Sequence, residues 1–329
     1  MQFQWLGLGL AAAGVVWWLW PMEEADPRFD ARVQAPAYKR LEPRPRVLID
    51  EAHLNRHTAR GRYGPFASLL RRDGYQIAIN RQRFNARLLE SAAALVVAEA
   101  LGVRGSLQEV ANRAGLEGAV HLSSNAFDDD ETLAVREWVR SGGALLLVAG
   151  HAPCGEAARS LAGRFGVEMT NGYLEDAAHH DLQSGNAAFL IFSRKNGLLQ
   201  EHPITQGEGE TERVQAVLSF TGQALKGPPG SVPFLKLSDQ AIEYPRRHPR
   251  PDEGRSAKGM AQGLAFEFGN GRVVVLGEAS MLTSQVIRVA GKELRIGMSR
   301  SGIDNQQLAL NIMHWLVKKK SEAGSQGSE

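Results

Sequence analysis

The sequence places its one cysteine beside a histidine, a pair that could carry out nucleophilic chemistry. Cys154 lies in the segment AGHAPCGEAARSL, three residues after His151, where a helix is expected to begin. A helix N-terminus lowers a thiol pKa, and a thiolate next to a histidine base is the basis of thiol hydrolases. In such enzymes, however, the nucleophile stands on a sharp turn directly after a strand. Four residues, Gly150 to Pro153, separate Cys154 from its predicted strand, which makes a catalytic cysteine the weaker interpretation.

A second candidate is the acidic stretch VLIDEAH at residues 47–53. It matches the second nucleotide-binding motif of helicases, in which the acidic pair holds magnesium. Such a site also needs a phosphate loop, G-x-x-x-x-G-K-[ST], earlier in the chain, and the sequence contains none. We therefore interpret Asp50, Glu51 and His53 as residues at the end of a strand, where they could line a ligand site together with Glu99 and His151.

His179 and His180 raise the possibility of a metal site shared with His151 and Cys154. Zinc sites combine such side chains, but they hold them on recognisable ligand spacings, and neither pair shows one. A surface loop with two histidines is the simpler interpretation, so we expect no bound metal and no cofactor.

The elements that would position these residues alternate between strands and helices. Short aliphatic runs, typical of buried parallel strands, occupy residues 46–50, 75–79, 94–98 and 144–149. Helical patterns occupy residues 65–72, 105–115, 128–141 and 156–165. This alternation predicts a mostly parallel sheet with helices on both faces. Sites in such sheets form beyond the carboxyl ends of the strands, here at residues 50–53, 98–99 and 150–155.

Local signals sharpen several boundaries. Asp128, with Glu131 three residues later, predicts a capping box. Strands are predicted at residues 188–192, 213–220, 232–237, 264–268 and 272–276, the last two joined by a Gly-Asn-Gly hairpin turn. Residues 119–122 could form another short strand. We expect a mobile, basic, proline-rich loop at residues 244–258 and a closing amphipathic helix at residues 303–319.

The composition excludes several classes of protein. The 38 basic and 36 acidic side chains leave a formal net charge of +2, which provides no large positive field for nucleic acid. A single cysteine excludes an intrachain disulfide framework and a multi-cysteine zinc knuckle. The hydrophobic fraction of 43% is too high for a disordered chain.

The first 22 residues read as a transmembrane anchor. Residues 2–22 contain no charged side chain, and tryptophans stand at both ends of the apolar run WLGLGLAAAGVVWWLW. A cleaved signal peptide would need a basic start and small residues before the cut, and both are missing. Residues 23–45 are rich in proline and charge, which predicts an extended stalk. Residues 46–317 would then form the α/β domain and residues 318–329 a flexible tail.

The side of the membrane stays open at this point. No lysine or arginine precedes the apolar run, whereas Arg28, Arg32, Lys39 and Arg40 follow it. By the positive-inside rule this count favours a cytoplasmic domain.

Several segments together resemble the membrane-anchored domain-of-unknown-function 4350 family, within the class I glutamine amidotransferase-like superfamily. The matching segments are VLIDEAHLN, FASLLRRDGY, DDDETLAVREWVRSGGALLLVAG, HPIT, GRVVVLGEAS and NQQLALNIMHWL. The resemblance covers roughly residues 46–317. It implies a flavodoxin-like sheet, an N-terminal anchor in the cell membrane and a domain outside the cytoplasm.

The resemblance implies a fold without the chemistry of the superfamily. Amidotransferases use a Cys–His–Glu triad with the cysteine at a strand-end elbow, and Gly150 or His151 falls near that place in this chain. We therefore expect a single-pass membrane protein with a non-catalytic domain that binds a protein partner or a small ligand. The alternative is a thiol hydrolase or amidotransferase that uses Cys154, with His151 or His179 as the base.

Overall fold

The computed structural model describes residues 24–26, 28–114, 125–247, 249–289 and 292–317. Five parallel strands form the centre of its largest sheet, in the order β3-β2-β4-β5-β15. Their bounds are Arg46–Asp50 (β2), Gln76–Asn80 (β3), Ala94–Ala98 (β4), Ala144–Val148 (β5) and Gly271–Leu276 (β15). Counted along the chain, this is the order 2-1-3-4-5 of flavodoxin-like sheets. The predicted parallel α/β sheet is confirmed.

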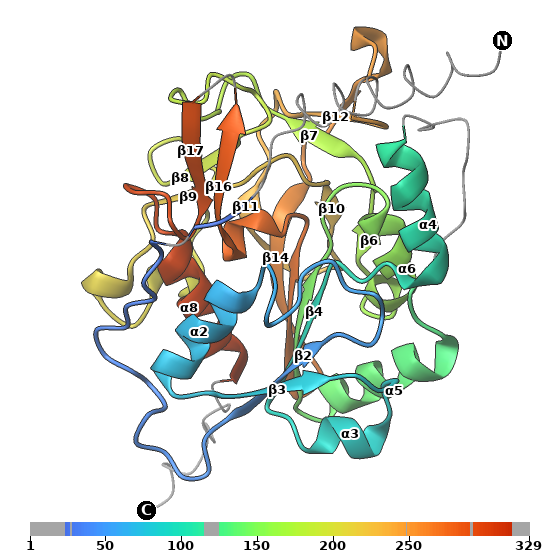
Figure 1. Ribbon diagram of the computed structural model, residues 1–329, viewed down its shortest axis with the longest axis vertical. Helices are drawn as coiled ribbons and strands as arrows, with labels where there is room; N and C mark the ends of the chain where they lie inside the picture. The colour runs from blue at the N-terminus through green and yellow to red at the C-terminus, as the bar shows by residue number, and fades with distance from the viewer. Residues whose placement is uncertain (1–23, 27, 115–124, 248, 290–291, 318–329) are drawn as a thin grey trace, which may run out of the picture.

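Helices cover both faces of this sheet (Figure 1). Alternate residues of a strand point to opposite faces, so Val47 and Ile49 pack on one side and Leu48 on the other. The first face is covered by α2 (Gly64–Asp73) and α8 (Asn305–Val317). The second is covered by α3 (Ala86–Glu90), α5 (Asp129–Arg140) and α6 (Cys154–Gly163), and α4 (Gly102–Arg113) packs against α6.

The sheet continues with antiparallel strands. The predicted Gly-Asn-Gly turn is confirmed, because it joins β14 (Ala261–Phe268) to β15 with Phe268 opposite Gly271. Beyond β14 lie β10 (Leu225–Lys226) and β6 (Glu168–Met169), and β11 (Val232–Lys236) also pairs with β14. Two of these strands, β6 and β10, were not predicted, because two-residue strands are too short to show an alternating pattern.

The segment predicted as a mobile loop contains short strands and a turn in its described residues, 244–247 and 249–258. The strands β12 (Ile242–Tyr244) and β13 (Arg255–Ser256) pair with each other, and β12 also pairs with β7 (Tyr173–Glu175). A 3-10 turn, η2 (Pro251–Glu253), lies between them, and Glu253 binds both Arg246 and Arg250. These ion pairs connect Arg246 and Arg250 to the turn.

Other elements complete the described part of the chain. The strands β8 (Ile191–Ser193) and β9 (Ala216–Leu218) form a two-stranded antiparallel sheet. The short helices of this part of the chain and of the segment after β15 are α7 (Pro203–Gln206), η1 (Glu210–Glu212) and η3 (Ser280–Leu282). A third small sheet contains β16 (Ser284–Val289), β17 (Lys292–Gly297) and β1 (Glu24–Ala25). The hairpin of β16 and β17 was not among the predicted elements.

The segment predicted as an extended stalk lies along the domain in its described part. Glu24 and Ala25 pair with β16, and the buried Asp26 forms an ion pair with Arg295 at 3.0 Å. Further along, the ring of Tyr38 packs against Tyr75 with 4.6 Å between centroids. Phe29, Val33 and Tyr38 all contact the hydrophobic core, so burying their apolar surface favours docking over free extension.

Three other predictions fall outside the described residues. These are the transmembrane anchor at residues 1–22, together with the tail at 318–329, and the short strand at 119–122. Among the helices that the structure describes, none combines the length and apolar character needed to cross a bilayer.

Candidate functional site

The carboxyl ends of the parallel strands bring several of the predicted site residues to one edge of the sheet. Asp50 ends β2, Glu99 follows β4 and His151 follows β5. The loop 51–63 follows β2 and hydrogen-bonds to the end of β4, next to the usual ligand position in this strand order. In that loop the Asn55 side chain donates to the Ala98 carbonyl oxygen at 3.2 Å, and the Arg56 backbone N–H donates to the Glu99 carbonyl oxygen at 3.0 Å.

Glu99 occupies the sharp strand-to-helix turn of this edge. Its φ is +53°, in the left-handed region that non-glycine residues rarely adopt, and α4 begins three residues later. A strained turn between a strand and a helix is the geometry of a nucleophile elbow. The elbow-like turn is therefore at Glu99, after β4. The expectation that it lies near Gly150 or His151, after β5, was wrong, because nothing in the sequence reveals a left-handed glutamate.

The Glu99 carboxylate is held by three donors from different parts of the chain. Oε1 accepts the Gly150 backbone N–H, and Oε2 accepts the Cys154 thiol at 3.0 Å and the Arg56 guanidinium at 3.2 Å. A Cβ at position 150 would lie 2.9 Å from Oε1, so a larger residue there would displace the carboxylate. The carboxylate is thus satisfied as a buried acceptor, as buried charges must be.

Cys154 acts as a donor in this arrangement. Its side chain is fully buried at the start of α6. Burial and the charge of Glu99 raise the pKa of the thiol well above its ordinary value, although Arg56, with Nη1 3.7 Å from Sγ, opposes the shift. The sulfur is therefore a protonated thiol at neutral pH, whereas nucleophilic cysteines are exposed thiolates.

His151 reaches the same edge without pairing with the thiol. Its ring stacks on Tyr173, with 4.6 Å between centroids and 18° between planes, and Nδ1 lies 2.9 Å from the Ala152 carbonyl oxygen. Burial, with the charge of Arg56, lowers the pKa of His151 to about 3. The imidazole is neutral at physiological pH, and the hydrogen-bond partners of the thiol are Glu99 and Arg56 instead.

Sequence reasoning missed three members of this edge: Arg56, His57 and Glu278. Glu278 follows β15 and is buried, which raises its pKa to about 7, and its carboxylate accepts the Met281 backbone N–H at 2.8 Å. Burial, and then the charge of Arg56, lowers the pKa of His57 well below its usual value. The available signal was position, since Glu278 directly follows the strand GRVVVLG and therefore ends at the same edge.

Asp50 and His53 form a separate buried network. His53 lies between two carboxylates, with Nδ1 2.8 Å from Asp50 Oδ2 and Nε2 2.9 Å from Glu131 Oε1. Burial opposes protonation of the ring, but Asp50 and Glu131 together outweigh it and raise the pKa of His53. The rings of Phe84 and Phe127 both pack against it, with 4.7 Å and 4.6 Å between centroids. This network joins β2 to α5.

The remaining candidates lie elsewhere. The Glu51 carboxylate accepts the Ala59 backbone N–H at 3.0 Å and so holds the loop 51–63 in place. His179 lies 3.2 Å from an Asp176 oxygen, and the His180 ring contacts the Ala177 carbonyl oxygen. Across the described ranges, no three or more His, Cys, Asp or Glu side chains are grouped so as to hold a metal ion.

Comparisons with known proteins identify a shared fold. No family model and no curated protein matches the chain. The N-terminal domain of mmIFT52 superimposes with a TM-score of 0.54 at 12% identity, over 83% of this chain and 97% of that one. At this identity the likeness concerns the fold alone.

Two bacterial structures align over a similar length with lower scores. A ThuA-like protein from Bacteroides uniformis gives a TM-score of 0.42 at 12% identity, over 90% of this chain and 97% of that one. A ThuA-like protein from Parabacteroides merdae gives 0.43 at 12% identity, over 86% and 93%.

Proposed function

We propose that the chain is a single-pass protein of the cell membrane whose amidotransferase-like domain, of the domain-of-unknown-function 4350 family, is non-catalytic and lies outside the cytoplasm. The domain binds a protein partner or a small ligand within a membrane-associated system. Residues 2–22 anchor it, and neither nucleic acid nor a cofactor takes part.

One observation carries the non-catalytic role, namely that a glutamate already engaged by three donors occupies the elbow-like turn. The Glu99 carboxylate accepts from Gly150, Cys154 and Arg56, and loop 51–63 hydrogen-bonds to the backbone of Ala98 and Glu99. The thiol of Cys154 is buried and donates its hydrogen bond to that carboxylate. A thiol hydrolase needs a free nucleophile, and a thiol engaged in this way does not supply one.

The test separates binding from thiol chemistry. The full chain and its Cys154→Ala and Cys154→Ser variants are crosslinked in cells, and the proteins that co-purify are identified. All three should capture the same partners, and a thiol-directed probe should not label the native protein at neutral pH. Partner capture that persists while Cys154→Ala abolishes a hydrolase or amidotransferase activity would favour the thiol enzyme instead.

The membrane side of the proposal is tested separately. Deleting residues 1–22 should release a folded domain from washed membranes, and a truncated chain that stays in the membrane after high-salt washing argues against a single anchor. A reporter fused to the C-terminus decides the side, and a cytoplasmic signal would contradict the extracytoplasmic placement.

A further inference from the structure

In helix α4 several apolar side chains are exposed and polar side chains face the domain, the reverse of the usual arrangement in a water-soluble domain. Val103, Leu107 and Val110, which we call the apolar stripe, are 69%, 56% and 65% exposed. Their spacing of four and three residues places them on one side of the helix. The other side holds the buried Gln108 and the partly buried Glu109, whose carboxylate pairs with Arg56 at 3.2 Å. A helix of this pattern has an apolar face that another phase or molecule must cover.

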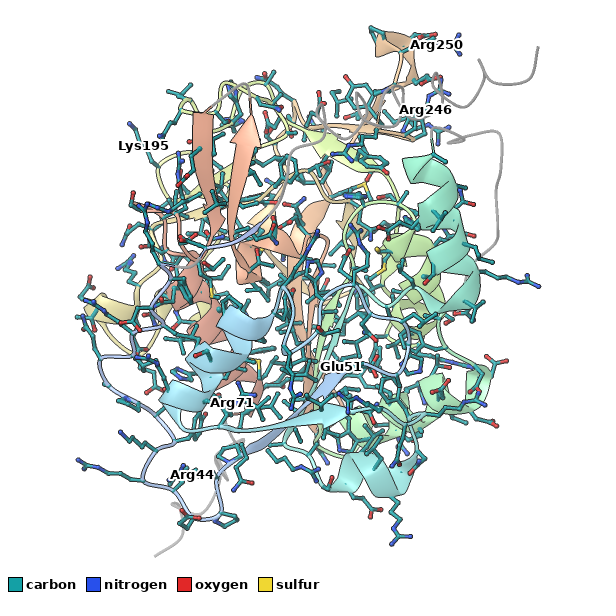
Figure 2. All side chains as sticks on the ribbon, viewed as in Figure 1. Arg44, Glu51, Arg71, Lys195, Arg246 and Arg250 are labelled. Carbon is teal, nitrogen blue, oxygen red and sulfur yellow. The ribbon has the colours of Figure 1, made fainter. Side chains whose placement is uncertain are left out.

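A basic projection lies at the same end of the molecule. Residues 244–247 and 249–258, which we call the arginine hairpin, contain five basic and two acidic side chains, a net charge of +3. Glu253 binds Arg246 and Arg250, so one acidic residue fixes two guanidinium groups on the projection. Arg250 is mostly exposed, and Figure 2 shows it and Arg246 on the segment that projects above α4.

The two features flank the same edge of the sheet. Tyr244 of the hairpin pairs with Tyr173, whose ring stacks on His151. His151 lies within electrostatic reach of Arg247 on the hairpin and of Arg56, the partner of Glu109 on α4. The described chain also starts in this half of the molecule, where Glu24 and Ala25 pair with β16 (Figure 1).

We propose that the apolar stripe of α4 and the arginine hairpin form a surface that seats the domain on an anionic lipid bilayer. This inference rests on the proposed membrane attachment and adds a second, peripheral contact to it. Exposed aliphatic residues enter the boundary between headgroups and acyl chains, while arginines bind lipid phosphates beside them. The positive charge next to the stripe favours an anionic lipid surface over an apolar protein partner, whose interface core would exclude charge.

The test uses the full chain in phosphatidylcholine vesicles that contain phosphatidylglycerol. A Leu107→Cys variant carries an environment-sensitive fluorophore, and lipids with a nitroxide on the acyl chain act as the quencher. Leu133→Cys is the matched control, since Leu133 is 46% exposed on α5, at the far end of the molecule. Cys154 is buried, so the unsubstituted chain measures background labelling.

We expect the label at residue 107 to shift to shorter wavelength and to be quenched by the nitroxide lipid, and the label at residue 133 to do neither. Val110→Cys should repeat the result of Leu107→Cys. Replacing Arg246, Arg247 and Arg250 with glutamine should weaken the seating about fivefold per arginine, the equivalent of about 1 kcal/mol each. In vesicles of phosphatidylcholine alone, the native arginines should weaken in their effect, and the seating should fall as far as it does in the triple glutamine variant.

Three results would overturn the inference. Equal signals from residues 107 and 133 would place α4 away from the bilayer. A wavelength shift at residue 107 without nitroxide quenching would show that a protein surface, such as a second copy, covers the stripe. Failure of the full chain to incorporate into vesicles would refute the membrane attachment itself, which the other two results leave intact.

Discussion

At the scale of single residues, the identity of residue 99 decides what this edge of the sheet can do. A glutamate with positive φ stands where a nucleophile would stand, and a buried thiol donates its proton to it. The strain of that backbone persists because three donors fix the carboxylate. Glu99 is therefore best understood as an anchor for the converging loops.

Removing the Cys154 donor should destabilise the domain. We expect Cys154→Ala to lower the free energy of unfolding by about 1–3 kcal/mol, because a buried carboxylate loses one of its donors. Cys154→Ser, which keeps a donor of similar size, should lose less. Urea denaturation of the two variants measures the difference, and equal losses would mean that the hydrogen bond contributes nothing.

The raised pKa of His53 predicts a pH-dependent contribution to stability. The folded protein binds this proton more tightly than the unfolded chain, whose histidine pKa is 6.5. The extra stability is therefore fully present below pH 6.5 and is lost as the pH rises through the folded-state pKa.

The unfolding free energies of the wild type and His53→Gln should accordingly differ most at acid pH and converge as the pH rises. Denaturation series across neutral pH test this. His180→Gln is the control, since its ring contacts only a surface backbone carbonyl among the contacts described. A difference that grows with pH would contradict the assignment.

The sequence predicted which residues lie at this edge of the sheet, but it did not predict which of them form hydrogen bonds with one another. Asp50, Glu99 and His151 were predictable because strand ends are visible in the hydrophobic pattern. The partners of Glu99 were not, because Arg56, Gly150 and Cys154 meet it only through folding of loops that lie about 40–55 residues away. The pairing of His53 with Glu131 spans 78 residues, a separation that no local pattern encodes.

At the scale of elements, α5 shows how a local signal and a long-range contact combine. The predicted capping box is confirmed, with the Asp128 side chain accepting the Glu131 N–H at 2.8 Å and Glu131 accepting the Asp128 N–H at 3.2 Å. Glu131 also accepts from Phe84 and contacts His53. One cap residue therefore ties the helix start to β2.

Mutating the cap should separate these two functions. Asp128→Ala should cost about 1 kcal/mol of unfolding free energy, the usual value of an N-cap. Glu131→Ala should cost more, since it also leaves His53 without one of its carboxylates. Asp130→Ala, on the exposed side of the first turn, is the control, and chemical denaturation of the three variants orders them. A loss for Asp130→Ala as large as that for Glu131→Ala would contradict this account.

The elements that the sequence predicts well are the ones with strong local patterns. The strands β2 and β4 coincide with their predicted bounds, and β5 differs by one residue. The hairpin of β16 and β17 was missed because its pattern is weak: Ser284 and Gln285 are buried in the first strand, and three charged residues interrupt the second. Its apolar residues pack on a satellite core with Phe189 and Leu218, a surface formed only in the folded protein.

At the scale of the whole molecule, residues 24–45 belong to the domain that they were expected to hold at a distance. The Ala37 N–H donates to the buried Asp73 at 2.8 Å, and Tyr38 packs against both Tyr75 and His314. His314 in turn lies 2.7 Å from Asp73, so the segment covers a contact between α2 and α8.

Truncation should reveal this contribution. A chain that starts at residue 24 should unfold like the intact domain, whereas one that starts at residue 46 should lose at least about 2 kcal/mol, because Asp73 loses a donor and apolar surface is uncovered. Tyr38→Ala in the longer chain should reproduce part of the loss. Thermal and urea unfolding of the three proteins measure the loss of stability. Equal stability of the two truncated chains would show that the segment contributes nothing to the folded state.

Under the proposed anchor at residues 2–22, the docked segment would also determine how far from the bilayer the domain can operate. Free, the 23 residues from 23 to 45 would reach about 70 Å at 3.1 Å per residue. With β1 already paired at Glu24, an anchor ending at Met22 leaves a single residue, Glu23, as slack. A domain tethered this closely by the proposed anchor would search for its partners in two dimensions, by diffusing laterally within the membrane. It would meet other proteins of the same membrane far more often than proteins in solution.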